Sequence, residues 1–300
     1  MTTQIPAGER CSAQWLRDDL PAWGTASRAN FWVALEQPGP WGANALTESR
    51  LDPELGRHFE TTCSEAGGRA VLVRRPGRHA DTGEGPFRVF IAGGLAAGAP
   101  WLGTTRLASS YDVIELLSLA DDLGHDPLPE WLDEADPILA VCTNARRDQC
   151  CALEGRHLLQ QCEGLDNLWE VSHLGGHRFA ATALVLPTGQ SLARVNPVIA
   201  ADALSAAAQG RPLAAGALHD RGLGHLPNHL QVADAWARAA GVPHPVAMTA
   251  EQLDDATWLV DVAGRALRVA RSDGPDELSS SCGKDVVPVL RWTLTQVHDG

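Results

Sequence analysis

Residues 136–196 concentrate cysteine and histidine at the ends of predicted secondary-structure elements. An apolar run (ILAV) ends on Cys142, a charged loop (TNARRDQ) follows, and a helical pattern (CCALEGRHLLQQC) begins at Cys150. Two strand-like runs (NLWEVS and RFAATALVLP) come next, with HLGGH between them. Loops at the ends of such elements can converge in space. The stretch therefore predicts a strand, a helix and two further strands, with a set of soft metal ligands at their ends.

The same order of elements precedes this stretch. FWVALE (31–36) predicts a strand, LDPELGRHFETTCSEAG a helix, and RAVLVRRPG and PFRVFIAGG two strands joined by a polar turn at 78–85. Acidic segments with a helical pattern, YDVIELLSLADDL and PEWLDEAD, then lead to the second half. The recurrence predicts two similar α/β sandwich domains, residues 1–130 and 131–300, although no residue-level repeat is visible.

Alanine is abundant after Asn196. VIAADALSAAAQG, LQVADAWARAAG and TAEQLDDATWLVDVAG predict helices, GRALRVARSD predicts a strand, and VVPVLRWTLTQV predicts a last strand or helix. We expect the helices to cover one face of the second sheet as a C-terminal extension.

Composition narrows the class of protein. The chain has 300 residues, 44% of them apolar, so it can bury a sizeable core. No apolar run reaches the roughly 18 residues that span a bilayer, and the N-terminus lacks the layout of a signal peptide. We therefore expect a soluble, cytoplasmic protein that does not bind membranes. A formal charge of −13 argues against nucleic-acid binding and suits docking to a basic redox partner protein, although acidity is also ordinary in cytosolic proteins.

The seven cysteines favour thiols over disulfides. Their number is odd and no export signal accompanies them, which disfavours a disulfide framework. No C-x-x-C occurs, so the dithiol chemistry of thioredoxins lacks its usual signature. We expect four of the cysteines to be buried structural residues: Cys11, Cys63, Cys162 and Cys282.

The histidine pair in HLGGH is expected in a loop. Its spacing is that of a zinc-protease helix, but the glutamate of that motif is absent and Gly175–Gly176 disfavour a helix. Glycines also let the backbone approach a ligand closely. In a loop, His173 and His177 can still direct two imidazoles at one point.

Two cysteines complete a set of four ligands. Cys142 closes a strand, and Cys151 opens a helix, where exposed N–H groups lower a thiol pKa and favour the thiolate that a metal needs. Arg146 and Arg147 add positive charge in the same loop. These features predict a metal site formed by Cys142, Cys151, His173 and His177.

The spacing leaves the kind of centre open. Structural zinc also takes two cysteines and two histidines, but usually from closely spaced cysteine pairs, whereas eight residues separate Cys142 from Cys151. The paired C-x-H motifs of Rieske centres are absent, and no H-E or H-x-E pair offers the general base of a catalytic zinc site. A thiol-based redox enzyme that uses Cys150 and Cys151 without a metal is a third alternative.

Several segments resemble the sucrase/ferredoxin-like family: CTNARRDQCCALEG, SHLGGHRFAATALVLPTG and LARVNP, and also WGTASRANFWVALEQPGPWG and HDRGLGHLPNHLQVADAW. Members are similar to thioredoxin-like ferredoxins, so the resemblance implies two thioredoxin-like domains, of which the second, ferredoxin-like one carries a cluster. It implies a [2Fe-2S] cluster held by two cysteines and two histidines, here Cys142, Cys151, His173 and His177. The spacing to Gly155 selects Cys151 over Cys150, which stays a reserve ligand.

The resemblance implies an electron carrier or reductase component rather than a stand-alone enzyme. Nothing in the sequence marks the pair of carboxylates that sucrose hydrolysis needs. Two neutral imidazole ligands leave the cluster less negative than four thiolates do, so its potential is expected above roughly −400 mV. Their N–H groups would couple the electron to a proton. Arg146, Arg147 and Arg178 are expected to tune the cluster through hydrogen bonds and charge.

Overall fold

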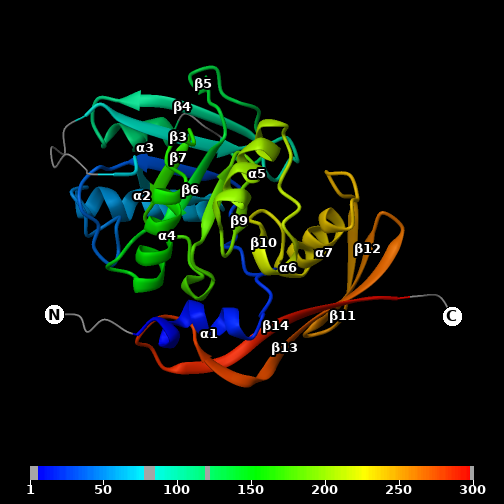
Figure 1. The fold of residues 1–300 in the computed structure, drawn as a ribbon. Coiled ribbons are helices and arrows are strands. Elements are labelled where there is room, and N and C mark those ends of the chain that lie inside the picture. The colour runs from blue at the N-terminus through cyan, green and yellow to red at the C-terminus, as the bar shows by residue number, and fades with distance from the viewer. Residues whose placement is uncertain (1–5, 78–84, 119–121, 298–300) are drawn as a thin grey trace.

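Ten strands from both halves of the chain form one mixed sheet. The computed structural model of the protein describes residues 6–77, 85–118 and 122–297. The strand order in the large sheet is β10-β9-β8-β6-β7-β2-β1-β3-β4-β5. Figure 1 shows where β3–β7, β9 and β10 lie in the fold. Its strands are β1 (Trp32–Glu36), β2 (Arg69–Arg74), β3 (Phe87–Gly93), β4 (Trp101–Leu107), β5 (Asp133–Glu134), β6 (Ile138–Cys142), β7 (Leu168–Val171), β8 (Ala183–Leu186), β9 (Gln190–Leu192) and β10 (Asp220–Leu223). The predicted α/β class is confirmed.

Helices connect these strands and cover the sheet. Within the described residues, the α-helices are α1 (Cys11–Arg17), α2 (Pro53–Glu65), α3 (Asp112–Ser118), α4 (Gln149–Gln161), α5 (Pro197–Ala208), α6 (Gly216–His219) and α7 (Asn228–Ala239). Two short 3-10 helices are η1 (Ala7–Glu9) and η2 (His177–Phe179). No helix in this part of the chain combines the length and the apolar composition needed to cross a bilayer.

The two halves of the sheet have the same topology. β1 is parallel to β2 and antiparallel to β3, and β6 is likewise parallel to β7 and antiparallel to β8. The resulting orders, β2-β1-β3-β4 and β7-β6-β8-β9, are joined by a short antiparallel pairing of β2 with β7. The predicted order of strand, helix, strand and strand therefore occurs in each half. Because the sheet is continuous across this seam, the division at residue 130 into two thioredoxin-like domains stays a prediction.

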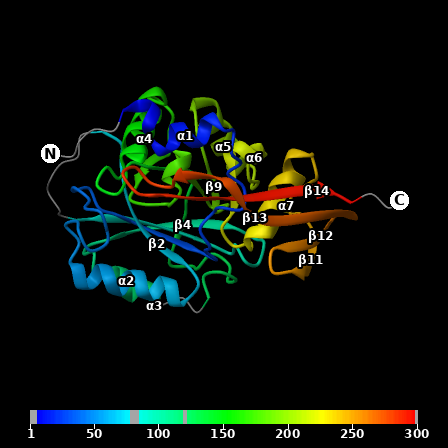
Figure 2. The same ribbon diagram turned by 90° about the horizontal axis from the view of Figure 1, so that it is seen from below.

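The sheet is strongly curved, so each half has one face covered by helices and one face turned toward the other half. Helices α2 and α3 pack on the first half, and α4 and α5 on the second (Figure 2). Phe90 of β3 and Trp169 of β7 are in edge-to-face contact, with ring centroids 5.1 Å apart. In a flat sheet, three strand spacings of about 14 Å in total would separate them. The curvature creates a shared core in which Cys142 and Cys151 are buried.

A second sheet forms the C-terminal region, which differs from the prediction. Its four antiparallel strands are β11 (Met248–Asp254), β12 (Thr257–Val262), β13 (Arg265–Ser279) and β14 (Val286–Gln296). α5 and α7 are helical as expected, but TAEQLDDATWLVDVAG forms β11 and β12. Buried Val260 and Val262 flank exposed Asp261, which is the period of two of a strand. A turn separates the two strands, where the Asp254 carboxylate accepts the N–H of Ala256.

Two further expectations concern connecting segments. PEWLDEAD contains the two-residue strand β5 and turns instead of a helix. The polar turn predicted at 78–85 lies outside the described residues except for Gly85. The β13–β14 hairpin is long and runs alongside α1, returning toward the start of α4 (Figure 1).

Candidate metal centre

The four side chains predicted as ligands lie at one edge of the shared core. Cys142 is the last residue of β6, and His173 follows the neighbouring parallel strand β7. Cys151 lies in the first turn of α4, and His177 begins η2. Because parallel strands end at the same edge of a sheet, the topology brings these segments together.

Sulfur and imidazole groups are in direct contact there. The Sγ atom of Cys151 is 3.3 Å from Nδ1 of His177. The rings of His173 and His177 stack with their centroids 5.0 Å apart. Both cysteines are buried, whereas both histidines are half-buried. Nδ1 of His173 is buried and has no hydrogen-bond partner among the described residues, so one ring nitrogen of the pair lacks a protein partner.

The pKa values of the two site cysteines are shifted in opposite directions. A hydrogen bond from Cys151 holds the pKa of Cys142 well below its usual value, and the imidazoles of His173 and His177 add to this effect. The same hydrogen bond, together with burial, holds the pKa of Cys151 well above its usual value. Burial lowers the pKa of His177, which favours the neutral imidazole. A metal binds cysteine as the thiolate and histidine as the neutral imidazole, so Cys151 would release a proton on binding.

Local features of the sequence explain why the two cysteines meet. Asp148 caps α4 by accepting the N–H of Cys150 at 2.7 Å. Gly155 faces the end of β6, where a Cβ atom would lie 2.3 Å from the carbonyl oxygen of Cys142. Glycine at this position therefore lets α4 approach the strand. The hydroxyl of Thr143 donates to Glu170 at 2.8 Å and anchors the chain after Cys142 to β7.

A buried arginine that the sequence did not mark holds the histidine loop. Arg221 donates hydrogen bonds to the carbonyl oxygens of Gly175 at 3.0 Å and Thr25 at 2.6 Å. Gly176 has a positive φ, and a Cβ atom there would lie 2.7 Å from the guanidinium carbon. Burial lowers the pKa of Arg221 to about 9, although the two site sulfurs favour its charged form. The segment HDRGLGH contains this arginine, but its pattern does not connect Arg221 to the distant histidine loop.

Arg146 and Arg147, two of the three arginines predicted to tune a cluster, are exposed in the turn between β6 and α4. The positive charge of Arg147 adds to the effect of burial in lowering the pKa of His177. Both side chains extend into solvent, so any effect they have on the site is through charge.

Arg178, the third of these arginines, is largely buried between aromatic rings. Its guanidinium lies 4.7 Å from the ring centroid of Trp15 and 4.6 Å from that of Phe179. Burial lowers the pKa of Arg178, and its electrostatic interaction with the sulfur of Cys11 acts in the opposite direction. A role of the three arginines in binding a cluster stays a prediction.

The adjacent residues Cys150 and Cys151 belong to different sulfur groups. Cys150, the reserve ligand of the sequence prediction, has its Sγ atom 3.4 Å from that of Cys11 and 3.1 Å from that of Cys282. Cys11 and Cys282 are 271 residues apart in the sequence, so no spacing could reveal their contact. Hydrogen bonds from Cys11 and Cys150 lower the pKa of Cys282 to about 3, which places a thiolate in this group.

The second sulfur group is the more compact of the two. Within the described part of the chain, one set of possible metal ligands has all its ligand atoms within 4.8 Å of one another: Cys11, Asp148, Cys150 and Cys282. This set contains no histidine. The predicted set of two cysteines and two histidines is more widely spread, and its ligation of a metal stays a prediction.

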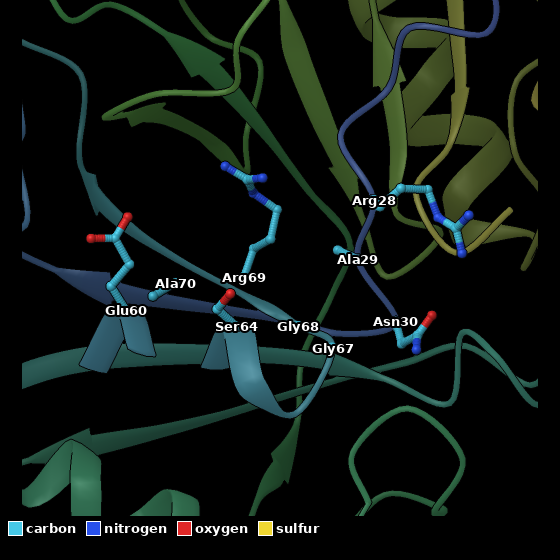
Figure 3. A pocket seen from close by; sticks show the side chains of 9 residues that line it. All are labelled: Arg28, Ala29, Asn30, Glu60, Ser64, Gly67, Gly68, Arg69 and Ala70. Atoms are coloured by element: carbon cyan, nitrogen blue, oxygen red, sulfur yellow. The ribbon is translucent and has the colours of Figure 1, made fainter. Parts of the chain in front are cut away.

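An open pocket lies beside the turn that ends α2. It is lined by residues 28–30, by the end of α2 and by the start of β2 (Figure 3). Its charged lining side chains are Arg28, Arg69 and Glu60. Glu60 is the one carboxylate in this lining, and none of the predicted ligands or tuning arginines lies in it.

Comparison with known proteins gives one match. No curated protein and no solved structure matches the chain. A family model described as sucrase/ferredoxin-like matches residues 22–213, a range that contains both predicted cysteine ligands and both histidines. The match confirms the family resemblance, although one of the segments that carried it, residues 219–236, lies outside the matched range. The chain belongs to the sucrase/ferredoxin-like family.

Proposed function

We propose that the protein transfers single electrons through a [2Fe-2S] cluster bound by Cys142, Cys151, His173 and His177. One observation carries the proposal: the two sulfurs flanking the β6–α4 connection and the two imidazoles of the histidine loop meet at one edge of the shared core. Membership of a family whose description includes ferredoxins supports it. Thiolate and imidazole are the ligands that proteins use for such clusters.

The donor set fits a centre with two irons. Nδ1 of His173 is buried without a hydrogen-bond partner among the described residues, as expected for a nitrogen that coordinates a metal when one is bound. A centre with two metal ions needs ligand atoms spread more widely than one ion does, and this set is indeed less compact than the other sulfur group. Bound there, the cluster supplies a one-electron redox couple.

The protein residues around the site determine where an electron can enter and leave. Cys142 and Cys151 lie in the core, whereas His173 and His177 are half-buried and reach the surface. The histidine side is therefore the short route between the site and a partner protein. The acidic chain, with a formal charge of −13, suits a partner with a basic surface.

Each half of the large sheet is a thioredoxin-like unit in this proposal, and the second half carries the cluster. The support is topological, because both halves have a parallel strand pair connected by a helix and followed by antiparallel strands. In the second unit, Cys142 and Cys151 lie on either side of the connection between β6 and α4.

The deciding experiment is the visible absorption spectrum of freshly isolated protein, together with iron and sulfide analysis. We expect a red-brown protein with visible charge-transfer bands, and an EPR signal after reduction. A protein that stays colourless after anaerobic reconstitution with iron and sulfide would overturn the proposal. Zinc bound at the Cys142 site without sulfide would identify a structural zinc site. Redox activity that survives in the double variant His173→Ala with His177→Ala would identify a thiol enzyme.

A ligand exchange tests the role of His177 directly. His177→Cys is expected to keep a cluster and lower its reduction potential, because a thiolate adds negative charge and disfavours the reduced state. The matched control is His157→Cys on the exposed face of α4, which should leave the potential unchanged. Equal potentials for the His177→Cys variant and the wild-type protein would mean that His177 does not bind iron.

A further inference from the structure

The second sulfur group, at the start of α4, has the geometry of a site for one metal ion. The Sγ–Sγ distances are 3.1 Å for Cys150 and Cys282, 3.4 Å for Cys11 and Cys150, and 3.7 Å for Cys282 and Cys11. A disulfide bond is about 2.05 Å long, so no pair is bonded. Thiolates on one tetrahedral zinc ion lie ~3.8 Å apart, given Zn–S bonds of about 2.3 Å. A zinc ion would need only a small outward movement of the three sulfurs.

The carboxylate of Asp148 lies in the same group as the three sulfurs. One carboxylate oxygen accepts the N–H of Cys150, and the other accepts the hydroxyl of Ser281 at 2.7 Å and the N–H of Cys282 at 3.0 Å. The carboxylate is buried, and two oxygens offer about four acceptor positions, so three hydrogen bonds leave one position for a metal. These hydrogen bonds also fix its orientation toward the sulfurs.

We propose that Cys11, Cys150, Cys282 and Asp148 bind one Zn²⁺ ion in a closed structural site. Three thiolates and a carboxylate fill the tetrahedral shell of zinc and leave no position for a substrate. Thiolate ligands also favour zinc over the harder divalent cations. The site is separate from the proposed iron–sulfur centre, although the two centres use the adjacent residues Cys150 and Cys151.

The zinc site would attach α1 and the β13–β14 hairpin to the start of α4. Cys11 begins α1, and Cys282 lies at the tip of the β13–β14 hairpin; both are outside the range 22–213 that matches the family model. α1 in turn packs on η2 through the edge-to-face contact of Trp15 with Phe179. Zinc would thereby fix the start of α4 and, through α1, the helix that begins with His177.

Charge around the group is suited to such a centre. Three thiolates, one carboxylate and a Zn²⁺ ion leave a net negative charge. The N-terminus of α4 and the guanidinium of Arg178, which interacts with Cys11, supply positive potential. Arg178 is therefore placed to stabilise the zinc site.

Metal analysis of the full-length protein tests the proposal. We expect one zinc per chain in the isolated protein, measured separately from iron. After removal of the metal, added Co²⁺ should give the intense visible bands of a tetrahedral site and sulfur-to-cobalt charge transfer. Cys11→Ser with Cys282→Ser should lower bound zinc at least tenfold, with zinc and iron counted separately in the same sample. The matched control, Cys63→Ser with Cys162→Ser, changes two buried cysteines outside the group and should keep zinc.

Three results would overturn the proposal. These are a wild-type protein that binds neither endogenous nor added Zn²⁺, a mass two units lower that reveals a disulfide in the group, and zinc that is lost with Cys142→Ser but retained in the Cys11 and Cys282 variant. If the double variant does not fold, Cys282→Ser alone and the cobalt spectrum of the wild-type protein decide the question.

Loss of zinc should also lower Tm by about 5 °C or more. Absence of iron would contradict only the proposed electron transfer, and absence of zinc only this site.

Discussion

The two halves of the large sheet share a topology but differ at one junction. In the first half, β1 ends on Glu36 and the long connection 37–52 leads to α2. In the second half, β6 ends on Cys142 and the short connection 143–148 leads to α4. Both helices begin after an aspartate cap, Asp52 or Asp148. The site therefore depends on a short connection, which brings a strand end next to a helix start, and on cysteine at both positions.

The largest expected effect comes from removing the sulfur at the strand end. Cys142→Ser should abolish iron binding. Loss of a residue that only supports a ligand lowers metal affinity by roughly 10–100-fold, and loss of the ligand itself lowers it further. The measurement is iron and sulfide per chain after anaerobic reconstitution. The control in the other half is Cys63→Ser in α2, also buried, which should retain the cluster. Equal iron loss in both variants would mean that the effect is on folding and not on ligation.

The next largest effect is expected at the seam between the halves. Arg74 on β2 is buried and donates to Glu170 on β7 at 2.8 and 2.7 Å. Arg74→Met removes this cation from a buried carboxylate, so the free energy of unfolding should fall by about 3–5 kcal/mol in denaturant titration. Arg75→Met on the next, exposed residue loses a cation–π contact with Trp169 and should cost less than about 1 kcal/mol. Similar costs for the two variants would show that the seam does not depend on the ion pair.

The sequence predicted those parts of the fold that follow from local pattern. The strand before Cys142, the helix at Cys151 and the loop HLGGH occur where the apolar runs and glycines indicated. The same kind of reasoning was wrong for 249–264, where the alternation that forms β12 was mistaken for a helical pattern. Local propensity could not decide that case, because the strands are stabilised by packing against α7 and against one another.

The parts of the site that the sequence did not reveal depend on distant contacts. Arg221 reaches the histidine loop from β10, and Cys282 reaches Cys150 from the tip of a hairpin. Neither residue has a spacing or a neighbour that marks it. The helical pattern alone could not distinguish Cys150 from Cys151. Adjacent residues of a helix point in different directions, and only the fold shows that Cys150 contacts Cys11 and Cys282 while Cys151 contacts His177.

Helix docking offers a finer comparison of the halves. A Cβ atom at Gly155 would lie 2.3 Å from the carbonyl oxygen of Cys142, and one at Gly56 in α2 would lie 1.8 Å from that of Leu46. Each Gly→Ala variant should lose about 1–3 kcal/mol of stability, because the helix must move away from the backbone. Gly155→Ala should also shift the visible spectrum of the cluster, whereas Gly56→Ala should leave it unchanged. A spectral change in both variants would contradict the assignment of the metal centre to the second half alone.

The smallest effect is expected from the exposed arginines of the connection between β6 and α4. Removing a positive charge near the cluster disfavours the more negative reduced state, so Arg147→Gln should lower the reduction potential. Exposed charge pairs contribute about 0.2–1 kcal/mol, which corresponds to roughly 10–40 mV for one electron. Arg146→Gln should shift the potential less, because Arg147 is the one whose charge acts on His177. Both shifts should shrink as salt is added, since screening weakens interactions between exposed charges. A larger shift that is independent of salt would mean that the arginine contacts the cluster directly. The arginines of this turn would then belong to the metal centre of the second half together with its cysteines.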